Sequence, residues 1–298
     1  MVAQVRRFNR LAVERIGALD EQFLGQARPL AEARVLWEIG EDGCEVRELR
    51  RRLGLDSGYL ARLLRSLERQ RLAALSAAPE DRRVRRARLT AAGVAERAEL
   101  DRRSDGVAAA LLDPLSEEER DRLTSAMAEV ERLLTASMVR VTVEDPESAD
   151  ARWCAERYAH ELDRRFPGGF DPAASTSARA SELTPPAGAL LIARLRRGPV
   201  GCGALRLGPG GVARISRMWV APEARGLGLG RRLLRELERH ALDRGATLVR
   251  LETNRSLTEA IALYRGSGYR EVEAFNDERY AHHWFEKALP PGRDAGRE

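Results

Sequence analysis

Hydrophobic positions in the first part of the chain recur at helical spacing and predict a series of helices. Apolar residues return at near-helical intervals over 2–23, and the pattern repeats over 30–39. Two shorter patterns, 45–53 and 57–70, are separated by three residues that end in Asp56, a suitable N-cap for the second helix. Two short helices joined by a tight glycine-containing turn predict a helix-turn-helix.

After residue 71 the pattern changes from helical to extended. Residues 72–76 and 84–89 read as two short strands on either side of a polar turn, and we expect them to pair as a wing. Two long helical patterns follow, over 91–112 and 116–138. The second of these opens on Ser116 and Glu119, which have the spacing of a capping box. The first half of the chain is therefore expected to be rich in helix.

Strand patterns dominate the second half of the chain. The predicted helices there cover 150–165, 232–239 and 257–264, and a polar stretch extends to Pro186. We expect strands at 139–143, 190–195, 200–207, 215–220 and 248–254, with closing strands within 275–287.

A glycine-rich turn connects the strand at 215–220 to the helix that follows it. Glycines allow a backbone to approach a ligand closely, and the first amides of a helix have no partners within it, so they form a natural anion site. The amides around Leu227, Leu229, Gly230 and Arg231 could therefore surround a pyrophosphate. A nicotinamide dinucleotide is not expected, because that fold places a differently spaced G-x-G-x-x-G turn after its first strand.

The run Arg225-x-x-Gly228-x-Gly230 resembles the R/Q-x-x-G-x-G/A signature of the GNAT-type N-acetyltransferases. The later strand, helix and Gly266-to-Tyr269 turn follow in the order of that family's pattern. The resemblance implies acetyl-CoA as acyl donor, with Tyr264 protonating the departing thiolate and Asn254 helping to hold the carrier. The residues that it implies for acetyl-CoA binding are Trp219, Val220, Arg225, Gly226, Leu227, Gly228, Leu229, Gly230, Arg231, Asn254 and Tyr264.

Acetyl transfer to an amine requires the amine to lose a proton, either to a base or to water. Glu252 is the best carboxylate within the motifs and is our candidate base, although a purely structural role at the strand end fits it equally well. Ser216 and Arg217 occupy the strand in which many relatives carry an acid.

The second helix of the helix-turn-helix has a face suited to DNA. Leu60, Leu63, Leu64 and Leu67 form its apolar stripe, so the opposite face points outward. The N-terminal residues of such a helix read base edges in the major groove, and arginine suits guanine or phosphate. The candidate DNA-binding residues of this helix are Ser57, Gly58, Tyr59, Arg62 and Arg65.

Residues 81–93, with Asp81-x-Arg83 followed by Leu89-Thr90-x-x-Gly93, resemble the wing of MarR-family winged helix-turn-helix regulators. The resemblance covers about residues 1–138 and implies wing contacts to DNA through Arg83, with Arg82 and Arg85 as further candidates. It also implies a homodimer on a palindromic operator of double-stranded DNA. One departure is Arg71, which stands where the family usually has a glycine with a left-handed backbone; such a conformation costs another residue about 1 kcal/mol or more.

Charge and composition agree with the prediction of a DNA-binding region followed by an acetyltransferase region. The net charge is only +5, but residues 47–88 hold 13 arginines and 5 acidic residues, and such a concentration favours a polyanion partner. No apolar run approaches the length of a membrane span, and no signal peptide is evident, so we expect a cytoplasmic protein without a membrane partner. The cysteines and histidines lack metal-site spacing, and no metal is expected.

Together these patterns predict a multi-domain chain. An all-α-rich winged helix-turn-helix domain is expected at 1–138, an α+β GNAT-like domain with a mixed, mainly antiparallel sheet at 139–290, and a disordered tail at 291–298. We expect a bifunctional transcriptional regulator and acetyl-CoA-dependent N-acetyltransferase acting on a small-molecule amine. The alternative is a regulator whose GNAT-like domain senses acetyl-CoA or a metabolite without turnover.

The acceptor amine is expected to carry an anionic group, because arginine binds carboxylate and phosphate with two parallel hydrogen bonds. The arginines predicted to border its site are Arg157, Arg164, Arg165 and Arg217, next to Phe166 and Phe170. The simpler alternative is that these arginines are surface groups in an arginine-rich chain.

Overall fold

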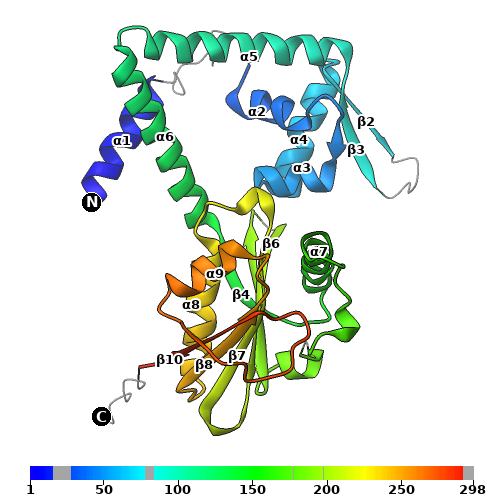
Figure 1. The fold of residues 1–298 in the computed structure, drawn as a ribbon. Coiled ribbons are helices and arrows are strands. Elements are labelled where there is room, and N and C mark those ends of the chain that lie inside the picture. The colour runs from blue at the N-terminus through cyan, green and yellow to red at the C-terminus, as the bar shows by residue number, and fades with distance from the viewer. Residues whose placement is uncertain (16–27, 78–83, 177, 197, 291–298) are drawn as a thin grey trace, which may run out of the picture. The chain divides into compact units, whose positions relative to one another are not determined.

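The computed structural model describes residues 1–15, 28–77, 84–176, 178–196 and 198–290. The chain divides into two compact units, Met1–Glu129 and Val130–Glu298, and the division falls within one long helix. The N-terminal unit is helical with a small sheet, and the C-terminal unit is an α+β structure around a larger sheet (Figure 1).

The N-terminal unit contains the predicted helix-turn-helix and wing. Its helices are α1 (Val2–Arg15), α2 (Leu30–Ile39), α3 (Val46–Leu53), α4 (Ser57–Arg69), α5 (Ala91–Leu112) and the beginning of α6 (Glu117–Met138). Strands β1 (Cys44–Glu45), β2 (Ala73–Ala77) and β3 (Arg85–Leu89) form a sheet in the order β1-β3-β2. Its core is built from α2 to α5 with the sheet, and the four leucines predicted to form the apolar stripe of α4 are all buried.

The helix starts that the sequence predicted are present. The Asp56 side chain accepts a hydrogen bond from the backbone N–H of Tyr59, and Ser116 and Glu119 form the expected reciprocal pair. Helix α4 ends at Arg71, which has a φ of 59° and so takes the left-handed conformation usual for glycine. The N–H of Leu72 bonds to the carbonyl of Leu67, and that of Arg71 to the carbonyl of Glu68. This pattern is a Schellman motif.

The wing and helix α5 approach each other closely. Thr90 caps α5 by accepting a bond from the N–H of Gly93, and its own hydroxyl donates to the carbonyl of Arg71. A Cβ atom at Gly93 would collide with the carbonyl oxygen of Leu72. Position 93 therefore requires glycine for packing.

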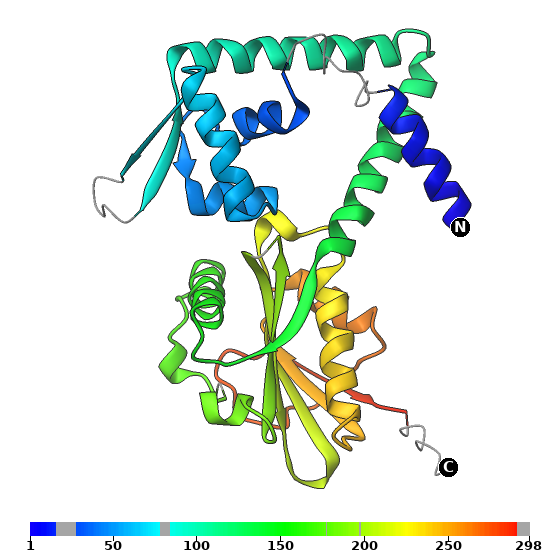
Figure 2. The same ribbon diagram turned by 180° about the vertical axis from the view of Figure 1, so that it is seen from behind.

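The C-terminal unit is organised around a seven-stranded sheet in the order β4-β5-β6-β7-β8-β10-β9, in which only the β7–β8 pair is parallel. The strands are β4 (Arg140–Glu144), β5 (Gly188–Leu195), β6 (Gly198–Leu207), β7 (Val212–Val220), β8 (Leu248–Thr253), β9 (Arg270–Val272) and β10 (His283–Ala288), and the helices are α7 (Ala149–Arg165), α8 (Leu229–Leu242) and α9 (Thr258–Arg265). Helices α7 and α8 lie on opposite faces of the sheet (Figures 1 and 2).

The closing part of the sheet differs from the sequence-based prediction. We expected closing strands within 275–287, but β9 already ends at Val272 and β10 begins at His283. The segment between them is irregular and contributes Glu278 and Tyr280 to a cavity. Strand β9 has only three residues, too few to show the alternation of apolar and polar positions by which a strand is predicted.

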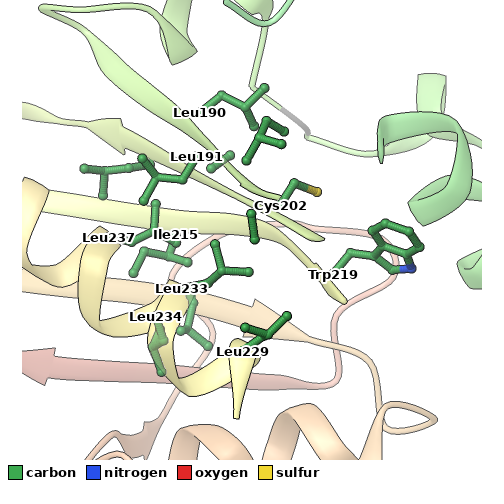
Figure 3. Close-up of a cluster of buried hydrophobic side chains, with 14 of the residues drawn as sticks. Leu190, Leu191, Cys202, Ile215, Trp219, Leu229, Leu233, Leu234 and Leu237 are labelled. Atoms are coloured by element: carbon green, nitrogen blue, oxygen red, sulfur yellow. The ribbon is translucent and has the colours of Figure 1, made fainter. Parts of the chain in front are cut away.

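The core of the C-terminal unit lies largely between α8 and the centre of the sheet. Leu229, Leu233, Leu234 and Leu237 of α8 are at most 2% exposed and pack toward Leu191, Cys202 and Ile215 (Figure 3). Burying each leucine contributes about 1.5–3 kcal/mol. This packing fixes the start of α8, and therefore the glycine-rich turn, against β7.

Strands β7 and β8 pair only at their beginnings. Val212, Ala213 and Arg214 are in register with residues 248–250, and no pairing continues beyond them. The strands therefore separate toward their carboxyl ends, while β6 continues to pair with β7 as far as Val220. The gap leaves backbone groups of β7 free on one side, where the cavities described below are found.

Candidate functional site

One cavity of the C-terminal unit, here called the carrier cavity, lies at the start of α8. It has a volume of about 560 Å³ and is lined by Arg225, Gly226 and residues 228–231, together with parts of β7, α7 and α9. Gly228 is the N-cap of α8 with a φ of 74°, a left-handed conformation that favours glycine. The first backbone bond of the helix runs from Arg232 to Gly228, so the N–H groups of Leu229, Gly230 and Arg231 have no partner within α8.

The cation expected to bind phosphate is held by an acid of helix α7. The Nη2 atom of Arg225 lies 2.7 and 2.6 Å from the two carboxylate oxygens of Glu161. Glu161 also accepts a hydrogen bond of 2.8 Å from the indole of Trp219. No local pattern predicts this contact, because Arg225 and Glu161 lie 64 positions apart in the chain.

A second cavity, here called the acceptor cavity, lies between α7, β7, β8 and the segment 275–281. It has a volume of about 90 Å³. Glu252 lines it and pairs with Arg214, whose Nε atom is 3.1 Å from a carboxylate oxygen. Phe170 and Tyr280, with ring centroids 4.9 Å apart, belong to an aromatic wall that also includes Phe166 and Tyr158.

Six residues line both cavities and so mark where the two meet: Tyr158, Leu162, Met218, Leu257, Ala260 and Tyr264. Burial raises the pKa of the Tyr264 phenol above its ordinary value, and the negative charge of Glu252 raises it further. Burial likewise raises the pKa of Tyr158. Both phenols are therefore protonated at neutral pH and can donate a proton.

The structure brings most of the sequence-predicted carrier residues together. Trp219, Val220, Arg225, Gly226, Gly228, Leu229, Gly230, Arg231 and Tyr264 all line the carrier cavity. Leu227 lines neither cavity and packs on the core instead. Asn254 lines the acceptor cavity; its amide donates to the carbonyl of Tyr280 at 2.7 Å and accepts from the N–H of Ser256 at 2.9 Å.

Helix α7 supplies residues of the carrier cavity that the sequence did not place there. Tyr158, Glu161, Leu162 and Arg165 follow helical spacing and all line the carrier cavity. Of the arginines expected at the acceptor, only Arg217 lines the acceptor cavity. Arg157 stacks on Trp153 and Arg164 is exposed, whereas Arg165 pairs with Glu259 at 2.7 Å.

The N-terminal unit carries a separate arginine-rich surface on α3, α4 and the wing. Ser57, Gly58, Arg62 and Arg65 are exposed, Tyr59 is partly buried, and the Arg62 guanidinium lies 5.5 Å from the Tyr59 ring centroid. Arg65 and the exposed Arg85 border a groove that also includes Arg47 and Arg50, which our sequence-based list of DNA contacts omitted. Arg82 and Arg83 lie outside the described residues.

Among the residues that the structure describes, no helix combines the length and the apolar character that a membrane span requires. Within the same residues, no group of three or more histidine, cysteine, aspartate or glutamate side chains could hold a metal ion.

Comparisons with known proteins address each unit. Residues 155–269 match the model of the acetyltransferase (GNAT) family, and residues 28–84 match that of the MarR family. An IAA acetyltransferase of Azospirillum brasilense is 39% identical over 117 residues, which are 39% of this chain and 76% of that protein. An uncharacterized N-acetyltransferase of Schizosaccharomyces pombe is 34% identical over 93 residues, or 30% of this chain and 57% of that protein.

Among solved structures, yncA from Salmonella typhimurium, determined with its cofactor acetyl-CoA, is similar, with a TM-score of 0.39 and 18% identity over 51% of this chain and 95% of that one. The sequence matches establish that this chain is a member of a family of acyl-CoA-dependent transferases. The chain belongs to the GNAT acetyltransferase family, and a MarR-family DNA-binding domain precedes its acyltransferase domain.

Proposed function

We propose that this protein transfers the acetyl group of acetyl-CoA to the amine of a small molecule, and that it also regulates transcription by binding a palindromic operator as a homodimer. The observation that carries the enzymatic part is the meeting of two cavities at Tyr158, Met218 and Tyr264. One cavity is bordered by unpartnered helix amides, and the other by aromatic and charged side chains.

The carrier cavity fits the chemical groups of acetyl-CoA. Three free N–H groups at a helix start, beside a left-handed glycine, suit a pyrophosphate. Arg231 is exposed at the same turn and adds positive charge. The unpaired edge of β7 at Met218 to Val220 offers backbone hydrogen bonds to an amide-bearing chain. The names of the two relatives support acetyl as the acyl group.

The residues at the junction suit direct transfer. Bound acetyl-CoA supplies the activated acetyl group. The acceptor cavity orients the amine, a C–N bond forms, and the C–S bond breaks. Tyr264 donates its phenolic proton to the leaving sulfur; a phenol carries its proton at neutral pH, and burial raises the pKa of Tyr264 further. We propose Glu252 as the group that takes up the amine proton, with Arg214 holding its carboxylate in position.

The carrier assignment is tested by two substitutions of equal shape at Gly228. A Cβ atom there meets nothing within 4 Å, and asparagine and aspartate tolerate its left-handed backbone. Gly228→Asn should keep measurable acetyl-CoA binding by calorimetry, whereas Gly228→Asp should lose it through charge repulsion. Equal affinities in the two variants would refute a pyrophosphate at this turn.

Catalysis is tested by screening amines with acetyl-CoA while following free thiol release. We expect release that depends on a small amine and the formation of its N-acetyl derivative. Tight acetyl-CoA binding without turnover on any amine would instead support a sensing role for the domain.

A further inference from the structure

Three arginines line the acceptor cavity, and they differ in whether an acid neutralises them. Arg206 pairs with Glu182 at 3.0 Å, and Arg214 pairs with Glu252. Arg217 has no acidic partner among the residues that the structure describes. Its recorded side-chain bond is from Nη2 to the carbonyl of Ala178, at 2.7 Å.

The position of Arg217 is structurally unusual. Strand β7 has a bulge opposite Cys202 and Ala204, so Arg217 falls outside the regular pairing. Its φ of 52° places a non-glycine residue in the left-handed region. Such strain costs about 1–3 kcal/mol and is concentrated at binding and catalytic sites. The bulge directs a partly buried guanidinium into the acceptor cavity.

A partly buried, unneutralised arginine is costly unless an anion joins it. Because Arg217 directly precedes Met218, which lines both cavities, an anion bound to Arg217 would lie close to the site of transfer. A molecule whose amine and anion are separated by few bonds fits this neighbourhood of Arg217 and the junction. The carboxylate of Glu278, which accepts hydrogen bonds from the hydroxyls of Ser175 and Thr176, lines the same cavity and complements a positively charged amine.

The remaining walls limit the rest of the molecule. Phe166, Phe170 and Tyr280 pack on one another with centroid distances of 4.9–5.8 Å and present an apolar surface. The volume of about 90 Å³ is small beside the 560 Å³ of the carrier cavity. The acceptor is therefore compact.

We propose that the acceptor is a compact α-amino acid with an apolar side chain, whose carboxylate is bound by Arg217 and whose side chain packs on the aromatic wall. The inference rests on the proposed acetyltransferase function and specifies its substrate class. Arg217 would be a specificity-determining residue and take no part in proton transfer.

The test compares amino acids with amines that lack the carboxylate. Thiol release by the full chain would be measured for the pairs leucine and 3-methylbutylamine, and alanine and ethylamine, with a blocked lysine peptide as a third class of acceptor. A charged hydrogen bond contributes about 1.5–3 kcal/mol, so we expect kcat/KM to favour each amino acid by about 10- to 150-fold.

Substitution of Arg217 should remove this preference selectively. In Arg217→Gln we expect the KM for leucine to rise at least tenfold and the preference in kcat/KM for leucine over 3-methylbutylamine to disappear, with the affinity for acetyl-CoA unchanged because Arg217 does not line the carrier cavity; Arg217→Lys should fall between. Arg196→Gln is the matched control, because Arg196 also has a left-handed φ, of 51°, but lies on the β5–β6 turn outside both cavities.

Direct binding separates this inference from the proposed function. Leucine should bind the CoA-saturated chain in calorimetry, and Arg217→Gln should abolish the signal. Acetyl-CoA binding without leucine binding, equal rates within each pair, or acetylation of the peptide alone would overturn the amino acid assignment. Loss of acetyl-CoA binding in the native chain would instead overturn the proposed acetyltransferase function.

Discussion

At the scale of single residues, Tyr264 is the group most directly tied to the transfer step. It lines both cavities, and its phenol carries its proton at neutral pH, as an ordinary tyrosine does, with a pKa that burial raises further. Replacing Tyr264 with phenylalanine should slow turnover by about 10²- to 10⁴-fold, the usual contribution of general acid catalysis. Calorimetry should show unchanged acetyl-CoA affinity, since only the hydroxyl is lost.

Tyr269 provides a matched control for this substitution. It is buried, and its ring centroid lies 6.0 Å from that of Tyr264, but it lines neither cavity. Tyr269→Phe should therefore keep the native rate. Full activity in Tyr264→Phe would assign the proton donation to another group, with Tyr158 the next candidate because it shares the junction.

Arg71 supports a prediction about stability. Its left-handed backbone costs a non-glycine residue about 1–2 kcal/mol, and its side chain is exposed. Arg71→Gly should therefore stabilise the end of α4 by about 1 kcal/mol, after allowance for the greater freedom of glycine in the unfolded chain. Hydrogen exchange of the α4 and β2 amides in the full chain measures this local free energy.

A glycine substitution in the interior of α4 should instead lower the local stability. Ala61→Gly replaces an exposed residue in the helix interior, where glycine costs about 1 kcal/mol. If Arg71→Gly accelerated exchange as Ala61→Gly does, the Schellman motif would depend on an interaction of the Arg71 side chain.

The sequence allowed predictions of residue roles wherever those roles depend on near neighbours. The cap by Asp56 follows from residues within one helical turn, whereas Arg71 stood out only as a departure from the glycine of the resembled family, and its left-handed backbone is a finding of the structure. The engagement of Arg225 by Glu161, and of Asn254 by Tyr280, could not be foreseen, because no local pattern links side chains so far apart in the chain. Similarly, only the structure shows that Arg206 and Arg214 have acidic partners, and that Arg217 has none among the described residues.

At the scale of elements, the glycine-rich turn, α8 and the helix α7 itself were predictable, whereas the contact of α7 with the carrier cavity was not. A glycine turn before a helix predicts an anion site from local sequence alone, because the first N–H groups of a helix have no partners within it. The α7 residues Tyr158, Glu161 and Arg165 reach the carrier cavity only because β7 and β8 separate after residues 214 and 250. Strand separation depends on long-range pairing and bulges, which leave no periodic signal.

The contact between α7 and the glycine turn leads to a prediction. Glu161 places a negative charge at the carrier cavity and occupies the guanidinium of Arg225 with both its oxygens. Glu161→Gln removes that charge but keeps a carbonyl oxygen to accept from Trp219. We expect acetyl-CoA to bind a few-fold more tightly, because an exposed ion pair contributes about 1 kcal/mol or less to the free energy.

Calorimetry of both proteins at low and high salt would measure the effect, which should shrink as salt screens it. Glu156→Gln, an exposed residue on the same helix that lines neither cavity, is the control. Weaker acetyl-CoA binding by Glu161→Gln would show that Glu161 instead holds Arg225 in its binding position.

At the scale of the whole molecule, two units with separate cores share one chain. The core around α4 and the core around α8 have no residue in common. The sequence placed the division at 138/139, where helix gives way to strand, while the compact units divide at 129/130 within α6. The last turns of α6 belong with the C-terminal unit, where Arg132 donates to the carbonyl of Gly226. A pattern of helical spacing cannot reveal which part of a continuous helix packs on which unit.

The full chain should bind its operator in a way that depends on Arg62. Because Arg62 is exposed near the start of α4 and stacks beside Tyr59, its guanidinium is positioned to read a base edge. We expect Arg62→Ala to lose about 1–3 kcal/mol of specific binding, with little change on unrelated DNA. Gel-shift titrations on the DNA upstream of the chain's own coding sequence would measure both affinities, and native affinity should fall steeply with salt as counterions are released.

Arg235→Ala is the control for this experiment, since Arg235 is an exposed arginine on α8 of the acyltransferase unit. The charge lost is the same, so a general effect of net charge would weaken both variants equally. Specific loss in Arg62→Ala alone would support α4 as the recognition helix. Native operator affinity and specificity in Arg62→Ala would exclude that assignment and move attention to Arg47 and Arg50, which border the groove between α3, α4 and the wing.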